Sequence, residues 1–246
     1  MKLFTRFAAL LVLGTLATAS LAGPPYNIDD PGTVEFRHFS LITYYASSHT
    51  AGSEAQGTPS FLLAYGLRNN VELDLVGGVT SARTTGIGRK TGFGDLSPMV
   101  RWRFKEETKN CPQFALGYQM KIPTASASQG LGTGAMDHAL WLSSAKSFKR
   151  LQAFGNVGYN FLGGSDGKNN LFYGVGLNYQ TTDKLILGAQ IYGNSANAPG
   201  NTDDLSWGIG AIYMYRPDQA LLLQAGRSMK GYSDLNIYAG IGFTFK

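Results

Sequence analysis

The chain has 246 residues, carries a formal net charge of +5 and consists of 43% hydrophobic residues. Its single cysteine, Cys111, excludes a disulfide within the chain, and the charge is too small, with no basic cluster, to indicate a nucleic-acid partner. Glycine accounts for 32 residues, nearly twice its usual share of about 7%, without the strict three-residue period of collagen. Such a content is tolerated where backbones crowd together or line a lumen.

The first 22 residues have the pattern of a secretory signal peptide. Lys2 and Arg6 give a positive start, the apolar run Phe7–Leu16 follows, and small residues precede a cleavage point at Ala22. The apolar run is too short to span a bilayer as a helix. We therefore predict that the mature chain begins at Gly23, in preference to a buried N-terminal helix.

Residues 23–33 form the next unit, which contains Asp29 and Asp30. Two interpretations of this N-terminal segment remain open: a loose periplasmic tail, or a small plug that folds into a lumen. The periplasmic tail is the plainer interpretation, because chain termini are generally loosely held.

For residues 34–246 we predict an all-β fold: a closed antiparallel up-and-down transmembrane β-barrel of about twelve strands. Apolar residues alternate with small or polar ones, so the mean hydropathy of −0.09 is close to neutral. An even strand count leaves both termini on the same side. The expected strands are Val34–Ala46, Ser60–Gly66, Val71–Ser81, Gly94–Phe104, Gln113–Lys121, Asp137–Lys146, Leu151–Phe161, Leu171–Gln180, Leu185–Gly193, Leu205–Tyr215, Leu221–Arg227 and Leu235–Phe245.

The connections between these strands alternate in length. Short periplasmic turns and long external loops are typical of outer-membrane barrels, whereas a soluble sandwich gives no reason for such regular alternation. The shorter set is Leu67–Asn70, Lys105–Pro112, Ser147–Arg150, Thr181–Lys184 and Arg216–Ala220. The longer set is Ser47–Pro59, Ala82–Phe93, Ile122–Met136, Leu162–Asn170, Asn194–Asp204 and Ser228–Asp234.

The last strand, Leu235–Phe245, has one apolar face and one mostly small or polar face. A chain that ends on such a strand favours closure, so we expect Leu235–Phe245 to pair with Val34–Ala46. The first and sixth strands do not alternate clearly, which leaves their facing open. Pro98 interrupts the fourth strand at a lipid-facing position, so we expect a bulge or a missing hydrogen bond there.

Aromatic residues gather at the strand ends on the apolar faces. Two aromatic girdles at the membrane interfaces account for this sorting better than scattered core residues do. The periplasmic set is Trp102, Phe104, Tyr179, Tyr213, Tyr215, Phe243 and Phe245, and the opposite set is Tyr159, Phe161, Tyr173 and Trp207.

The candidate functional residues are polar side chains at lumen-facing positions. Glu72 and Asp74 lie on the third strand, near the periplasmic end of a hairpin. The fourth strand of that hairpin carries Arg101 and Arg103. We expect an ion-pair network that acts either as a charged constriction or only as neutralisation of buried charges. The full set of candidate lumen-lining residues is Glu72, Asp74, Arg101, Arg103, Gln119 and Lys121.

The sequence predicts no catalytic site, no metal site and no cofactor. A Ser-His-acid arrangement needs three groups within hydrogen-bond reach, but His138 and Ser144 lie about 20 Å apart along one strand. His38 and His49 have no partner that the sequence selects. No zinc-ligand spacing appears, and the glycine-rich stretches lack the Lys-Ser/Thr ending of a phosphate-binding loop.

Four sets of short motifs follow one another along the chain. They are Ile28-Asp-Asp-Pro-Gly-Thr33; Gly92-Phe-Gly-Asp-Leu96 leading to Arg101-Trp-Arg-Phe104; Lys121-Ile-Pro-Thr124 with Gly130-Leu-Gly-Thr-Gly134 and Asp137; and Gly240-Ile-Gly-Phe-Thr-Phe245. Together they resemble the family of outer-membrane proteins named for the meta pathway of phenol degradation. Ala125, where that family often has glycine, and Lys246, after the last aromatic, depart from the pattern. The resemblance implies a transport-related barrel with aromatic compounds as cargo.

We therefore expect an outer-membrane channel or transporter for small molecules, with aromatic or hydrophobic compounds as candidate solutes, and not an enzyme. Outer-membrane lipid and lipopolysaccharide would surround it. Two alternatives remain. A lipid-modifying barrel enzyme would need an exposed Ser-His-polar cluster, and a non-conducting scaffold or adhesin would need a lumen filled by side chains.

Overall fold

The computed structural model describes residues 25–50, 53–84, 88–164, 167–197, 202–230 and 233–246. The predicted signal peptide, residues 1–22, lies outside the described residues. Among the residues that are described, no helix has the length and apolar character needed to cross a membrane.

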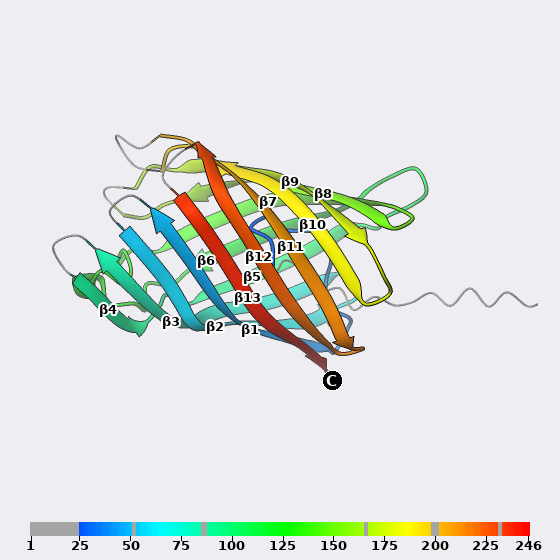
Figure 1. Ribbon diagram of the computed structural model, residues 1–246, viewed down its shortest axis with the longest axis horizontal. Coiled ribbons are helices and arrows are strands. Elements are labelled where there is room, and N and C mark those ends of the chain that lie inside the picture. Colours follow the sequence, from blue (N-terminus) through cyan, green and yellow to red (C-terminus); the bar gives the residue numbers. More distant parts are fainter. Residues whose placement is uncertain (1–24, 51–52, 85–87, 165–166, 198–201, 231–232) are drawn as a thin grey trace, which may run out of the picture.

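The described chain is almost entirely strand (Figure 1). Within the described ranges there is a single short 3-10 helix, η1, which covers Ala127–Gln129. The strands are β1 (Phe39–Thr50), β2 (Ser53–Arg68), β3 (Val71–Thr84), β4 (Gly88–Phe93), β5 (Ser97–Lys105), β6 (Gln113–Lys121), β7 (Asp137–Phe148), β8 (Leu151–Phe161), β9 (Asn170–Gln180), β10 (Leu185–Asn194), β11 (Asp204–Arg216), β12 (Gln219–Lys230) and β13 (Ser233–Phe245).

The strands close into a barrel with antiparallel neighbours. Each strand from β5 to β13 pairs with the next, β13 pairs with β1, β1 with β2, and β2 with β3. Strands β4 and β5 both pair with β3, at its two ends, so together they occupy one interrupted position in the wall. The wall therefore has twelve positions, which confirms the predicted fold class and the predicted pairing of the last strand with the first.

The first strand begins later than expected. It starts at Phe39, and Phe39 pairs with Phe245. Arg37 has a left-handed φ of 62°, and its N–H donates to the carbonyl of Gly66, so the chain turns there. Residues 34–38 therefore precede the barrel wall, although the expected first strand began at Val34.

The strands on one side of the barrel are longer than predicted. β1 runs to Thr50 and β2 begins at Ser53, so most of the expected loop Ser47–Pro59 is strand. β3 likewise runs to Thr84 and β4 covers Gly88–Phe93, so the described part of the expected loop 82–93 is also strand. Their polar, serine- and threonine-rich residues suggested loops, but backbone pairing between neighbours continues through them.

The expected irregularity at Pro98 is confirmed on one side of β5. Pro98 pairs in register with Leu75 of β3, but the β5–β6 ladder begins at Met99 and pairing resumes only at the bridge between Leu96 and Ile122, so Pro98 has no partner on β6. The wall is also interrupted between Phe93 and Ser97. A register shift also occurs in the β2–β3 pair next to Gly78, which has a φ of 138° that favours glycine.

Side chains alternate between the two faces of the wall. In β7, Leu140 and Leu142 are exposed on the outside, whereas Trp141 and Ser143 are buried on the inside, which settles the facing of the sixth predicted strand. In the first strand, Ser40 is likewise buried inside. Nine of the eleven strand-end aromatics are at least 40% exposed, which fits outward-facing girdles: Trp102, Phe104, Tyr159, Phe161, Tyr173, Tyr179, Trp207, Tyr213 and Phe245.

Two apolar clusters occupy the interior. The first consists of wall side chains: Ile42, Ile212, Ala220 and Leu222, with Leu62, Tyr44 and Tyr238 packed against them. The second joins the wall residues Ala145 and Phe154 to Ile28, which belongs to the chain ahead of β1. In Figure 1 this N-terminal stretch, drawn in blue, lies between the walls of the barrel.

Candidate functional site in the barrel lumen

Residues 25–34, which we call the inner segment, lie against the lumen-facing side of the wall. Pro25 and Pro31 are less than 2% exposed, and Ile28 is 2% exposed. The backbone N–H of Asn27 donates to Oε1 of Gln190 at 3.1 Å, and at the other end the N–H of Val34 donates to Oε2 of Glu72. The inner segment thus contacts both β10 and β3.

Glycines on the inner face of the wall form the seat for this segment. A Cβ added at Gly174 or Gly176 would collide with the side chain of Ile28. Similarly, a Cβ at Gly188 would collide with the hydroxyl of Tyr26, and a Cβ at Gly210 with its ring. These positions need glycine because the inner segment approaches the wall closely, which accounts for part of the high glycine content.

Arg101 is the centre of the polar contacts. Its guanidinium donates from Nη2 to Oδ1 of Asp29 at 2.8 Å and from Nε to Oδ2 at 3.1 Å. Nη1 donates to Oε1 of Glu72 at 2.5 Å and to the carbonyl of Gly32 at 3.1 Å, and Nη2 lies 3.9 Å from Asp74. One buried cation therefore joins two carboxylates of β3 to the inner segment, in the forked geometry that arginine makes with a carboxylate.

Trp141 completes the clamp on Asp29. Its Nε1–H donates to Oδ2 of Asp29 at 2.8 Å, so this carboxylate accepts bonds from β5 and β7 together. Thr33 adds a further contact, because its Oγ1 donates to the carbonyl of Asn69 at 3.2 Å. The inner segment is held by polar bonds at Asp29 and by apolar packing at Ile28.

The structure brings together three of the six predicted site residues. Glu72, Asp74 and Arg101 meet within 4 Å, as their neighbouring strands suggested. Arg103 does not join them: it pairs with Glu106 at 3.0 Å, and its Nη2 donates to the carbonyl of Asn69 at 2.7 Å.

The other two residues have no described contact with Arg101. Gln119 lines the same lumen pocket as Arg101 and Trp141. Lys121, at the end of β6, pairs with Asp137 at 2.5 Å and donates to Oγ1 of Thr133 at 2.8 Å. It also lies 3.7 Å from Asp95. Lys121 thus ties the connection 122–136 to the mouth that lies opposite the short turns.

Sequence reasoning missed the partners that the inner segment supplies. Asp29 was visible as an acidic residue ahead of the barrel, but nothing in the sequence connects it to Arg101, which lies 72 positions later. Trp141 gave a signal, since it is the aromatic residue between Leu140 and Leu142 and must face the other way.

A pocket of about 500 Å³ lies above the inner segment, on the side away from the short turns. Asn160 and Asn194, near strand ends at that mouth, form its rim. Tyr26, Asn27, Ile28 and Asp29 belong to its lining, together with Arg101, Trp141, Asn156, Phe172 and Tyr192. The inner segment is therefore one wall of this pocket, which we call the vestibule pocket.

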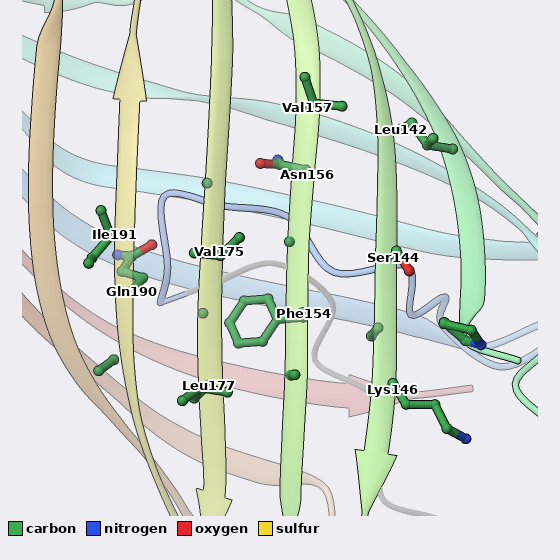
Figure 2. Close-up of a pocket in the computed structure, with 17 residues that line it drawn as sticks. Leu142, Ser144, Lys146, Phe154, Asn156, Val157, Val175, Leu177, Gln190 and Ile191 are labelled. Atoms are coloured by element: carbon green, nitrogen blue, oxygen red, sulfur yellow. The ribbon is translucent and has the colours of Figure 1, made fainter. Parts of the chain in front are cut away.

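A second hollow, of about 780 Å³, follows β7 to β10. Outward-facing Val157, Val175 and Ile191 are 47%, 66% and 48% exposed and border it, while the small residues Ala153 and Ala189 lower the surface between them. Apart from Pro112, its lining residues belong to β7, β8, β9 and β10. Figure 2 shows them with the inner segment, in blue, passing behind. These exposed apolar side chains belong to the outer face of the wall, so the hollow is separate from the lumen.

The two histidines with described side chains are both engaged. Nδ1 of His138 lies 2.8 Å from the hydroxyl of Tyr118, and Nδ1 of His38 lies 3.1 Å from the carbonyl of Phe36. The side chain of His49 lies outside the described residues. In the described part of the chain, no group of three or more histidine, cysteine or acidic residues is arranged to hold a metal ion.

Residues 22–246 match the model of a protein family described as "Putative MetA-pathway of phenol degradation". No curated protein matches the chain. Among solved structures, an outer membrane channel from Pseudomonas putida F1 superposes with a TM-score of 0.71 at 13% identity, covering 88% of this chain and 98% of its own. The KdgM porin in complex with disordered oligogalacturonate gives 0.58 at 8% identity, covering 84% and 99%. LpxR from Salmonella typhimurium gives 0.51 at 12% identity, covering 83% and 99%.

Proposed function

The chain belongs to the phenol-degradation family whose model it matches over residues 22–246, and from this premise we propose that it is an outer-membrane channel for small molecules. The closed barrel and its outward-facing aromatic ends support a place in a lipid bilayer. Outer-membrane lipid and lipopolysaccharide surround the wall in this proposal, and a small solute passes through the lumen. Channels and porins among barrels of similar fold support the same proposal.

The inner segment acts as the plug of this channel. The observation that carries this proposal is that residues 25–34 contact opposite parts of the wall, from Glu72 on β3 to Gln190 on β10. A chain that crosses the lumen in this way obstructs it. Since the segment is held by hydrogen bonds, ion pairs and packing, it can leave its seat without any covalent step.

Glu72, Asp74 and Arg101 act on passage through the plug. Arg101 is 3% exposed, and its guanidinium donates hydrogen bonds to Asp29, Glu72 and the carbonyl of Gly32. Such an arginine forms a latch for the segment and leaves little charge for a passing solute. In this proposal the two expected roles of the cluster are combined. The contacts that neutralise the buried charges are the same contacts that hold the plug and so control passage.

Solute flux into liposomes tests the proposal. Two proteins are compared with empty vesicles: the unmodified protein, and a variant in which residues 25–33 are replaced by a glycine-serine chain of equal length. We expect slow flux with the unmodified protein and at least about tenfold faster flux with the variant. Losing about 1.4 kcal/mol of the free energy that holds the inner segment in the lumen already shifts the equilibrium between the plugged and open states tenfold. Flux equal to that of empty vesicles for both proteins would reject a channel.

The filled interior also favours a second candidate, the non-conducting scaffold or adhesin. Wall side chains such as Leu222 and Ile42, less than 2% exposed, and the inner segment occupy different parts of the lumen. This candidate predicts that neither protein conducts, so the flux experiment decides between the two. An enzyme acting on lipid has less support. His138 contacts Tyr118, and His38 contacts the carbonyl of Phe36 and the carboxylate of Glu35, so neither histidine has a serine among its described contacts.

A further inference from the structure

The vestibule pocket has aromatic faces on its wall. Trp141 packs over Gly117, and Phe172 packs over Gly158, since a Cβ added at either glycine would collide with the ring above it. Both rings lie close to bare glycine backbone, and both residues line the pocket. Flat rings in this arrangement offer stacking surfaces to a solute ring.

Amide groups surround these faces, and one has a buried atom without a partner. Oδ1 of Asn156 is buried and makes no hydrogen bond, although Asn156 lines the pocket. Leaving such an atom unpaired costs free energy that a bound group can recover. A hydroxyl both donates and accepts, so it can pair with an amide in either orientation. Asn27, Asn160 and Asn194 offer further amides around the same space.

The floor of the pocket has no surplus of positive charge. Arg101 is its cation, and Asp29, Glu72 and Asp74 all lie within 4 Å of that guanidinium. A negatively charged solute would approach a cation that is already paired with carboxylates. Desolvating that solute would gain no new ion pair, so anions are disfavoured.

We propose that the vestibule pocket is a solute-binding site for a neutral ring compound that carries hydroxyl groups, and that the site exists only while the inner segment is seated. The second part follows because Tyr26, Asn27, Ile28 and Asp29 form one wall of the pocket. A solute that needs this wall binds the plugged state and stabilises it. Bound solute therefore slows its own passage, and net flux levels off as the pocket fills.

Two sources share this chemistry: phenolic rings and neutral sugars. Phenolic rings use mainly the stacking faces, whereas sugars use mainly the amides. The inference rests on the proposed function only in treating residues 25–34 as the plug, since binding itself requires no transport.

Fluorescence of Trp141 gives a direct measurement of binding. The chain has three tryptophans, and Trp102 and Trp207 face outward, so a Trp102→Phe, Trp207→Phe protein reports Trp141 alone. It is titrated with phenol, glucose, benzoate and glucuronate, with excitation at the red edge of indole absorption to avoid the probes. We expect a saturable change with phenol or glucose, at least about tenfold tighter than with the anion of the same class.

Two variants locate the site. Asn156→Leu should weaken binding of the active neutral probe about tenfold or more, because it removes the amide. Asn178→Leu is the matched control: it is also an inward-facing amide with an unpartnered buried oxygen, but it does not line the pocket, so binding should stay unchanged. The variant with residues 25–33 replaced should lose binding altogether.

The inference is overturned by any of three results. These are no saturable response to either neutral probe, equal affinity for neutral and anionic probes, or binding that survives replacement of the inner segment. Flux measured on the same proteins keeps the two proposals apart. Flux without binding rejects the site alone, and binding without flux in any variant rejects the channel alone.

Discussion

Two parts of the interior are filled in opposite ways. Near β1, β12 and β13 the wall fills the lumen with its own side chains, among which Ile42 and Leu222 are 1% and 0% exposed. Along β9 to β11 the inner face is lined by glycines, and the space is filled by Tyr26 and Ile28 of the inner segment. The first filling can leave only if the barrel unfolds, whereas the second belongs to a chain that can move as a unit.

The bonds of the two parts differ as well. The cluster at Leu222 is apolar, so its strength comes from burial and does not depend on any single bond. The inner segment depends on Asp29, whose two oxygens accept bonds from Arg101 and Trp141. The wall cluster around Leu222, which we call the fixed cluster, therefore sets the stability of the barrel. The inner segment, which can be released, sets whether the lumen is open. Four variants and one control variant test this division.

Removing the charge of Asp29 should have the largest effect. In Asp29→Asn the fork to Arg101 is lost, while Glu72 and Asp74 still compensate the arginine, so the barrel stays folded. Breaking a buried pair costs about 3 kcal/mol or more, which raises the open fraction on the order of 100-fold. Open probability in planar bilayers measures this. Unchanged gating with a folded barrel would mean that Asp29 does not hold the plug.

Truncating a side chain of the fixed cluster should have the opposite effect: it should lower the stability of the barrel and leave the gating unchanged. Leu222→Ala removes a side chain with no exposed surface, and we expect the free energy of unfolding to fall by about 2–5 kcal/mol. Urea unfolding in lipid vesicles checks the loss. Because the inner segment keeps its seat, open probability should remain that of the unmodified protein, and a rise in it would break the proposed division.

Adding one methyl group to the seat should have a smaller effect. In Gly174→Ala the new Cβ collides with Ile28, and overpacking of this kind costs about 1–3 kcal/mol, so open probability should rise about tenfold. Gly240→Ala is the control, because its Cβ would meet Tyr44 and Tyr238 of the fixed cluster at 3.1 Å. Equal gating in the two variants would argue against a glycine seat.

The smallest effect is expected outside both parts, at the connection between β5 and β6. Burial raises the pKa of Glu107, but hydrogen bonds from Lys146 and Ser147 outweigh it and leave the pKa below its usual 4.5. A lowered folded-state pKa adds stability that is present above the unfolded pKa and is lost as pH falls through the folded value. Glu107→Gln should reduce stability by less than about 1 kcal/mol, with no change in gating. Unfolding midpoints of the unmodified protein and the variant at pH 7 and in mild acid measure this loss and its pH dependence. A difference in midpoint that is the same at both pH values would contradict the role given to Glu107.

The wall was predictable because most of its strands carry their own alternating pattern. Apolar residues at every second position show which face of β12 or β13 is outside, and closure follows from the last strand. Strand lengths in β1 to β4 were not predictable, because polar residues there lack the alternation that lipid imposes. The turn at Arg37 was also hidden, since its left-handed φ depends on the bond to Gly66, a contact between distant segments.

The candidate site was predictable only within one hairpin. Glu72 and Arg101 are paired neighbours on β3 and β5, so the sequence alone placed them together. Asp29 reaches the same cluster through a segment without alternation or fixed direction, and no local pattern reveals its destination. The glycines at 174 and 176 gave a composition signal, but their role depends on which residue lies above them.

Single-channel recording on the variant with residues 25–33 replaced tests the central claim most directly. If the inner segment is the releasable plug, the unmodified protein should show long closed periods with brief openings, and the variant should stay open at the same conductance level. An identical closed record for both proteins, with both barrels folded, would contradict the claim.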